Sequence, residues 1–212
     1  MRISNHDVLL IIDVQNDFCT GGALAVPHGE EVAPICNRLG SIFSNVVLTQ
    51  DWHPPGHVSF ASAHPGRAPF ETITVSYGKQ TLWPDHCVQG SRGAGLHGGL
   101  HMPHAQLILR KGFLAAVDSY SAFQENDRVT RTGLASYLKE RQIGRIFLAG
   151  LAFDYCVRAS AVDARLAGFP AIVIEDACRA IDLEGSVTRT HEDFHGTGVQ
   201  QIRSEEIAPE HA

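Results

Sequence analysis

The sequence lacks three features: a long hydrophobic run, a cluster of basic residues and a regular spacing of cysteines. The apolar run at 8–12 stops at Asp13 and is too short to cross a membrane, and no leader-type cleavage site follows it. Asp and Glu outnumber Lys and Arg by 23 to 17, and no basic face indicates a nucleic-acid partner. We therefore expect a cytoplasmic protein that binds neither membranes nor nucleic acids.

The five cysteines are dispersed, and an odd, scattered set does not predict a disulfide framework. We expect most of them to be reduced and inert, which leaves the question whether one is reactive. They are Cys19, Cys36, Cys87, Cys156 and Cys178.

Short apolar runs rich in β-branched residues alternate with stretches of helical periodicity. Buried strands that alternate with helices predict an α/β fold with a parallel sheet covered on both faces. The expected strands are 8–12, 46–49, 107–109, 146–149 and 171–174, with a weaker sixth near 199–202. The expected helices are 30–43, 130–141 and 156–167.

The region 51–105 departs from this alternation, because it is rich in Gly, Pro and His and has no convincing periodicity. Long irregular insertions in compact domains are usually functional or disordered, and the two Trp and many His residues here favour function. There is no repeat and no linker, so we interpret 1–212 as a single domain with a frayed tail after Ile207.

Ionisable residues follow four of the expected strands. Asp13, Asp51, Lys111 and Cys156 each come at or just after a strand end, and His53 follows Asp51 by two residues. Taken singly, such an Asp is often a turn cap, such a Lys a solvated surface residue and such a Cys a small buried hydrophobe. Ligands bind outside the carboxyl ends of parallel strands, so the convergence of these residues at one edge predicts a functional site.

A chemical role can be written for each member of this group. A thiol reacts as its thiolate, which a helix N-terminus and a nearby cation favour. Asp13 would take the proton of Cys156 and later pass it to a leaving amine, while Lys111 would balance the charge and orient Asp13. Backbone N–H groups of Ala152 and Cys156 can bind a developing oxyanion. The residues thus predict a cysteine amidohydrolase acting on a small carboxamide.

Carboxylate and imidazole side chains gather in the irregular region. We expect Asp51, His53 and His86 to bind a divalent metal ion, zinc first and iron or manganese as alternatives, with His57 as a possible fourth ligand or supporting residue. Surface histidines are the competing interpretation, and we assign it to the four that lack such a context. These are His64, His97, His101 and His104.

Two aromatic residues are candidates for binding a flat substrate ring. Phe18 and Trp83 can stack on such a ring, as is typical of small-ligand pockets with few polar anchors. Core packing is the alternative for Phe18. With a thiol available as nucleophile, a metal need not activate water and can instead anchor a ring nitrogen.

Taken together, these segments resemble the nicotinamidase (pyrazinamidase) family of the isochorismatase-like cysteine hydrolases. The resemblance spans nearly the whole chain, in the expected order. The matching segments are 12–19 (IDVQNDFC), 21–26 (GGALAV), 51–54 (DWHP), 83–90 (WPDHCVQG), 111–112 (KG), 118–123 (DSYSAF) and 150–157 (GLAFDYCV).

The resemblance implies a three-layer α/β/α fold around a mostly parallel six-stranded sheet. It also implies hydrolysis of nicotinamide to nicotinate and ammonia through a cysteine thioacyl intermediate, in NAD salvage, with pyrazinamide-like analogues as side substrates. It assigns catalysis to Asp13, Lys111 and Cys156, and it implies a cis peptide before Ala152. Its metal ligands, the same Asp and two His residues as above, hold an ion that contacts the pyridine nitrogen.

Two other functions compete with this one. The first is a sister amidohydrolase acting on a substituted pyridine carboxamide or on a carbamoyl or ureido compound, although the Asp-x-His pair at Asp51 and His53 favours a nitrogen heterocycle. The second is a non-catalytic metal-binding or regulatory module, against which the presence of all three catalytic candidates argues. The identity of the metal, the ring substituents and a possible homo-oligomeric state stay open at this point.

Overall fold

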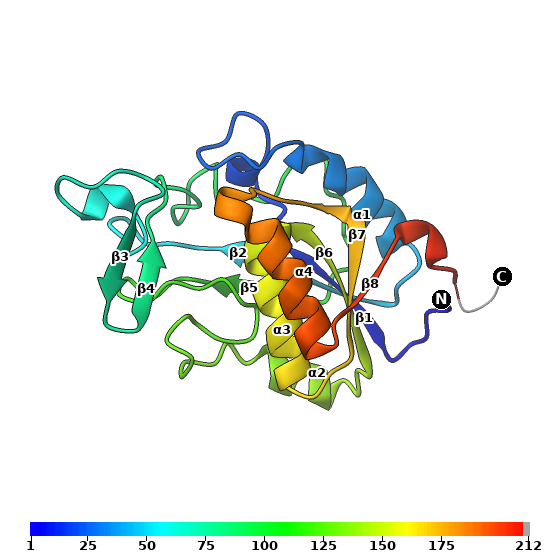
Figure 1. Cartoon of the computed structure of the whole chain (residues 1–212). Helices are drawn as coiled ribbons and strands as arrows, with labels where there is room; N and C mark the ends of the chain where they lie inside the picture. The colour runs from blue at the N-terminus through cyan, green and yellow to red at the C-terminus, as the bar shows by residue number, and fades with distance from the viewer. Residues whose placement is uncertain (210–212) are drawn as a thin grey trace.

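Six parallel strands form the centre of the computed structural model, which describes residues 1–209 (Figure 1). Their order across the sheet is β5-β2-β1-β6-β7-β8, and every neighbouring pair is parallel. This arrangement confirms the predicted parallel sheet. The strands are β1 (Asp7–Ile12), β2 (Asn45–Asp51), β5 (Leu107–Lys111), β6 (Arg145–Leu151), β7 (Ala171–Arg179) and β8 (Gln200–Ile202).

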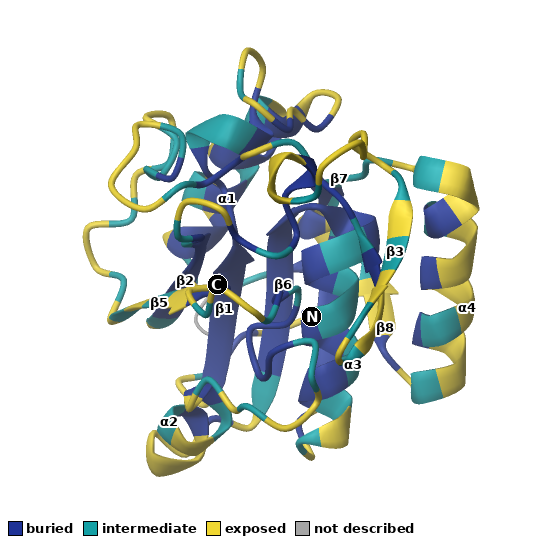
Figure 2. Ribbon diagram, turned by 90° about the vertical axis from the view of Figure 1, so that its left-hand side faces the viewer, coloured by how far each residue is buried: buried dark blue, intermediate teal, exposed yellow. Residues whose placement is uncertain are grey.

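Helices cover both faces of the sheet, as predicted. Along β1, Leu9 and Ile11 pack in one apolar cluster, whereas Val8 and Leu10 pack in the other. The first cluster includes α1 (Val32–Gly40), and the second includes α2 (Leu134–Glu140), α3 (Arg158–Leu166) and α4 (Ser186–Thr197). Alternate side chains of a strand point to opposite faces, so a run that is apolar throughout fits a strand with two covered faces. Figure 2 shows the central strands in dark blue, buried between these layers.

The expected helices are shorter in the structure than in the sequence analysis. The helix expected over 30–43 is a 3-10 turn (Gly29–Glu31) followed by α1, and Pro34 lies in its first turn, where the missing N–H costs nothing. The helix expected over 156–167 is a π-helical turn (Phe153–Val157) followed by α3. Further 3-10 turns are Asn16–Phe18, Ala61–Ala63, Leu183–Gly185 and Ser204–Glu206.

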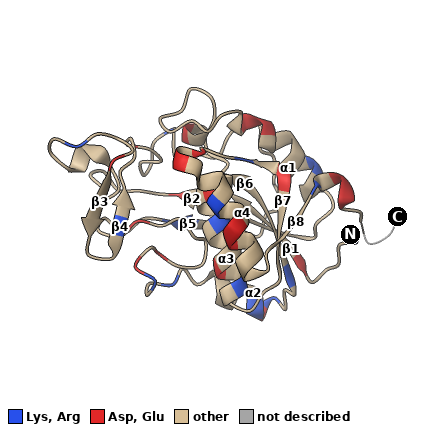
Figure 3. Cartoon of the chain, viewed as in Figure 1, with Lys and Arg blue, Asp and Glu red and all other residues tan. Residues whose placement is uncertain are grey.

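Two elements were not predicted. One is the antiparallel hairpin of β3 (Thr72–Val75) and β4 (Gly78–Thr81), which stands at one end of the molecule in Figure 1. Its strands are four residues long and partly exposed, too short to give a clear alternation. The other is α4, most of whose residues are polar. Arg158 of α3 pairs with Asp193 of α4, and Figure 3 shows charges of both signs along these two helices.

The end of the described chain is tied to its beginning. Ala208 N donates to Met1 O (3.0 Å), and Ile3 N donates to Ala208 O (3.2 Å), so the fraying expected after Ile207 is wrong at Ala208. Residues 210–212, on which the rest of that expectation falls, lie outside the described residues. Within 1–209, no helix has the length and apolar character needed to cross a membrane.

The strand order has a topological switch point between β1 and β6. The chain moves from β1 outward to β2 and β5, then returns to β6 on the other side of β1 and continues to β7 and β8. In open parallel sheets, such a switch point forms a crevice at the carboxyl ends of the two strands. Asp13 directly follows β1 and Cys156 follows β6, so both lie at this crevice.

Candidate active site

Three buried side chains meet at the switch point. Lys111 Nζ lies 2.8 Å from Asp13 Oδ2 and 3.4 Å from Cys156 Sγ. Asp13 and Lys111 are fully buried, and Cys156 is 6% exposed. The carboxylate directly follows β1, the ammonium ends β5 and the thiol lies in the turn after β6, so the convergence expected from their positions is present in the fold.

The backbone and its neighbours fix the orientation of Asp13. The residue has a left-handed φ of 48°, and Thr49 on β2 accepts from its amide (3.1 Å) and donates to its Oδ1 (2.5 Å). Gly150 on β6 lies so close to the end of β1 that a Cβ at this position would be 2.1 Å from Ile12 O. Only glycine therefore lets the two strands approach each other here. Lys111 Nζ also donates to Ser119 O (3.2 Å). These contacts leave Asp13 Oδ2 facing the lysine and the thiol.

The electrostatics of the group favour a neutral thiol in the resting site. Burial raises the pKa of the Cys156 thiol well above its ordinary value, and Asp13 and Asp51 add to this, against the opposing effect of Lys111. Burial also raises the pKa of Asp13, and Lys111 only partly offsets it. Burial lowers the pKa of Lys111, but the two carboxylates outweigh it and raise the pKa well above the usual range. The resting site therefore holds a neutral thiol beside a cationic lysine and an unusually basic carboxyl group.

Asp51, His53 and His86 form a second group beside the first. Asp51 Oδ2 lies 3.7 Å from His53 Nε2 and 3.9 Å from His86 Nε2, and one potential ligand atom from each residue lies within 4.8 Å of the others. Asp51 Oδ1 accepts a hydrogen bond from Lys111 Nζ. One carboxylate thus joins the two groups, with one oxygen toward the lysine and the other toward the imidazoles.

Backbone carbonyls set the protonation of both imidazoles. His53 Nδ1 lies 2.8 Å from Gly112 O, and His86 Nδ1 lies 2.8 Å from Pro84 O. A carbonyl oxygen only accepts, so each Nδ1 carries a proton, and each Nε2 is turned toward Asp51. Burial lowers the pKa of His53, but the hydrogen bond and the charge of Asp51 outweigh it and raise the pKa above its usual value. Burial lowers the pKa of His86 to about 4, assisted by the nearby His53, which keeps that ring neutral. An imidazole whose Nδ1–H is held by a carbonyl can bind a metal ion through Nε2 once that nitrogen has no proton.

His57 lies behind His53 and outside the Asp51 group. Its ring stacks on that of His53 at 4.2 Å, with Nδ1 2.8 Å from Ser59 Oγ and Nε2 3.2 Å from Val117 O. Asp118, which was not among the predicted site residues, lies close to His53 and His57. Its carboxylate accepts from Gln80 Nε2 on β4 (2.7 Å). The only signal for it was its place at the start of the segment 118–123.

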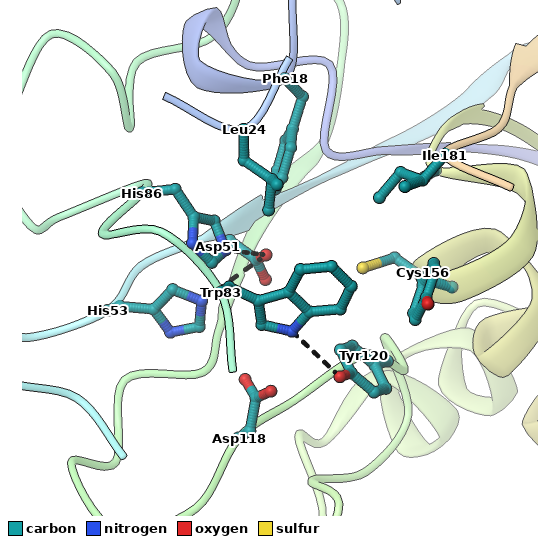
Figure 4. Close-up of a pocket in the computed structure, with 12 residues that line it drawn as sticks. Phe18, Leu24, Asp51, His53, Trp83, His86, Asp118, Tyr120, Cys156 and Ile181 are labelled. Atoms are coloured by element: carbon teal, nitrogen blue, oxygen red, sulfur yellow. Dashed lines mark hydrogen bonds and ion pairs between the residues drawn. The ribbon is translucent and has the colours of Figure 1, made fainter. Parts of the chain in front are cut away.

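An apolar pocket connects the two groups. Phe18 and Trp83, expected to contact a flat ring, both line it, and Trp83 Nε1 donates to Tyr120 Oη (3.1 Å). Figure 4 shows His53, His86 and Asp51 on one side of the pocket, with Cys156 and Ile181 on the other. Ala152 also lines it, at the cis peptide that follows Leu151. The lining residues that the sequence analysis missed are Leu24, Asp118, Tyr120, Tyr155 and Ile181.

A buried thiol in contact with a lysine and near a carboxylate, at the switch point of a parallel sheet, defines the class of α/β hydrolases that act through a cysteine. The model of one protein family, described as an Isochorismatase domain, matches residues 7–206. The chain belongs to this family.

Several characterised proteins are similar to this chain. A nicotinamidase of Acinetobacter baylyi is 51% identical over 207 residues, which cover 98% of this chain and 97% of the relative. Two solved structures cover almost all of both chains. That of a nicotinamidase and pyrazinamidase of Acinetobacter baumanii has a TM-score of 0.95 at 51% identity, covering 96% of this chain and 98% of the other. That of PnC1 from L. infantum, in complex with nicotinate, has a TM-score of 0.87 at 38% identity, covering 99% and 98%.

A further similar structure contains a metal. The pyrazinamidase of Pyrococcus horikoshii in complex with zinc has a TM-score of 0.76 at 30% identity, covering 93% of this chain and 99% of the other. In this chain, the group of Asp51, His53 and His86 is a candidate for holding such an ion.

Proposed function

We propose that this chain hydrolyses nicotinamide to nicotinate and ammonia, as an amidohydrolase in NAD salvage. The observation that carries the proposal is the position of Lys111 Nζ, in contact with Asp13 Oδ2 and with Cys156 Sγ at the edge of an aromatic pocket. The nicotinamidases to which the chain is similar, and the nicotinate bound in one of the related structures, support the substrate.

The first half of the reaction forms a thioacyl intermediate. Asp13 takes the proton of Cys156 as Sγ attacks the amide carbon, and the carbonyl oxygen becomes an oxyanion that accepts from the backbone N–H groups of Ala152 and Cys156. Asp13 then gives this proton to the amide nitrogen, the C–N bond breaks and ammonia leaves. A raised pKa suits Asp13 to both steps, because a general acid–base works best when its pKa lies near the working pH.

The second half releases the acid. A water molecule gives a proton to Asp13 and attacks the thioacyl carbon, and the C–S bond breaks. The sulfur recovers its proton from Asp13, and nicotinic acid is released, which gives its own proton to ammonia or solvent and becomes nicotinate. Lys111 stays protonated throughout, because its raised pKa keeps it cationic between Asp13 and Asp51. It orients Asp13 and balances the negative charge of the site.

The donor set of Asp51, His53 and His86 fits a divalent ion, because it combines one carboxylate with two imidazoles whose Nε2 atoms both face that carboxylate. These three residues would hold the ion, which would supply a Lewis acid for the pyridine nitrogen of the substrate. We propose zinc, on the strength of the zinc complex of a related pyrazinamidase, whereas the same donors also accept iron or manganese. Phe18 and Trp83 then enclose the ring, with the amide carbon turned toward Cys156.

Ammonia release from nicotinamide by the purified protein tests the function. We expect steady turnover by the wild type and a loss of at least about 10⁴-fold in the Cys156→Ala variant, because the nucleophile is removed. Robust turnover by the alanine variant would exclude Cys156 as the nucleophile. Release of ammonia from a ureido or carbamoyl compound, but not from nicotinamide, would favour the sister amidohydrolases instead.

A further inference from the structure

One buried carboxylate close to the nucleophile has no part in the reaction written above. Asp154 lies in the π-helical turn (Phe153–Val157), two residues before Cys156, and is fully buried. It does not line the pocket, and no Lys, Arg or His among residues 1–209 forms an ion pair with it. A buried charge without a counter-ion needs hydrogen bonds to be tolerated.

Three neutral donors supply those hydrogen bonds. Asp154 Oδ1 accepts from Ile181 N (3.0 Å), and Oδ2 accepts from Asp182 N (2.7 Å) and from Ser186 Oγ (2.5 Å). All three donors belong to the segment 181–186, which connects β7 to α4. The carboxylate therefore joins the turn that carries Cys156 to a segment 27–32 residues away in the sequence.

This segment needs an external support. Asp182 and Glu184 have left-handed φ values of 56° and 51°, a conformation that disfavours side chains with a Cβ. Without Asp154, the amides of Ile181 and Asp182 would lose the acceptor that they use here. The same segment brings Ile181 into the pocket, where Figure 4 shows it on the side of Cys156.

We propose that Asp154 is a positioning residue. It fixes the positions of Cys156 and Ile181, which line the same pocket, relative to each other. This role rests on the proposed amide hydrolysis, in which the thiol must face the carbonyl carbon of a ring held in that pocket. A misplacement of about 1 Å at a reacting group is enough to cost about 100-fold in rate. Asp154 prevents such a shift, because its carboxylate connects the turn that carries Cys156 to the segment that carries Ile181.

The chain offers a matched control at Asp176 on β7. Its carboxylate accepts from Ser204 N (2.7 Å) and Ser204 Oγ (2.6 Å), so it also holds a 3-10 turn through an amide and a hydroxyl. It has no contact with the pocket. In Asp154→Asn a backbone amide faces the new NH₂ in either orientation of the side chain, and in Asp176→Ala the amide of Ser204 loses its acceptor. Both variants therefore leave a backbone amide without its partner, but only one of them affects the site.

The experiment compares Asp154→Asn with Asp176→Ala by steady-state kinetics on nicotinamide, thermal unfolding and the rate of Cys156 alkylation by iodoacetamide, with Cys156→Ala as the blank. We expect kcat/KM to fall about 10–100-fold in Asp154→Asn and to stay within about twofold in Asp176→Ala, at comparable losses in Tm. Alkylation of Cys156 should become faster only in Asp154→Asn, because the thiol is 6% exposed in the held turn. Equal kinetics and equal alkylation in the two variants would overturn the proposal.

Ser186→Ala is the second variant, in case Asp154→Asn does not fold. It keeps both backbone amides on Asp154 and removes one hydroxyl. We expect KM to rise severalfold with kcat nearly unchanged, since the Ile181 wall loosens while the turn with Cys156 keeps its carboxylate. An unchanged KM would count against the coupling. If the wild type does not hydrolyse nicotinamide, the proposed function fails, whereas the alkylation comparison still decides the role of Asp154.

Discussion

The pocket has two sides that are built in different ways. On the sheet side, Asp13, Lys111 and Cys156 sit at or just after strand ends, and the hydrogen-bonded sheet sets their positions. On the loop side, His86 and Trp83 come from the region 51–105, which lies outside the central sheet and is held by scattered backbone hydrogen bonds and side-chain contacts. The reacting groups thus lie on regular elements, whereas His86 and Trp83, which would contact the metal or the substrate ring, lie on loops. This division is common in enzymes.

The loop side depends on a few buried polar contacts. Gln80 of the β3–β4 hairpin donates to Asp118 Oδ2 (2.7 Å), and Asp118 N donates to Tyr77 Oη (3.1 Å). Asp17 Oδ2 accepts from Cys87 N (2.7 Å), next to His86. Each contact joins segments far apart in the sequence. We therefore expect substitutions on the two sides to differ in kind: loss of chemistry on the sheet side, and weaker binding of metal and substrate on the loop side.

The largest effect is expected on the sheet side. Asp13→Asn should lower kcat by about 10²–10⁴-fold, because the amide cannot carry the proton from the thiol to the leaving nitrogen. KM and zinc content should change little, since Asp51 and the two histidines are untouched. Steady-state ammonia release and metal analysis of the purified variant measure both.

Asp7→Asn is the matched control for this change. Asp7 is buried at the other end of β1 and pairs with Arg145 at 2.6 Å, so its loss removes a buried carboxylate from the same strand without touching the pocket. We expect it to lower stability and to leave kcat within about twofold. A similar fall of kcat in both variants would mean that Asp13 acts through the fold rather than through the reaction.

The same division explains what the sequence could predict. Asp13, Lys111 and Cys156 were expected at one edge because apolar runs locate parallel strands, and parallel strands place their ends together. The partners of Asp51 followed only from short motifs and a family resemblance. The hairpin that carries Gln80 and the segment that carries Ile181 left no periodic signal, since their positions depend on long-range polar contacts rather than on a repeating apolar pattern.

A middle-sized effect is expected at the histidines of the loop side. His86→Ala should weaken zinc binding by more than about 100-fold and raise KM for nicotinamide, because one of three converging donors is lost. His57→Phe keeps a ring stacked on His53 but removes both nitrogens, and should weaken binding by at most the roughly 10–100-fold typical of a lost supporting partner. Competition with a chromophoric chelator measures the affinities. Equal losses in the two variants would make His57 a direct ligand.

The smallest effect is expected at the β3–β4 hairpin. A substitution there tests whether the hairpin only supports the loop side or also affects the chemical step. Gln80→Leu leaves Asp118 Oδ2 without the amide that donates to it, and a buried acceptor that loses its partner costs about 1–3 kcal/mol. Lys79→Ala, the exposed neighbour on β4, should cost less than about 0.5 kcal/mol. Urea unfolding gives the stabilities, and kinetics should show KM rising severalfold in Gln80→Leu with kcat nearly constant. A fall in kcat without a change in KM would place the hairpin with the sheet side and remove the contrast between the two sides.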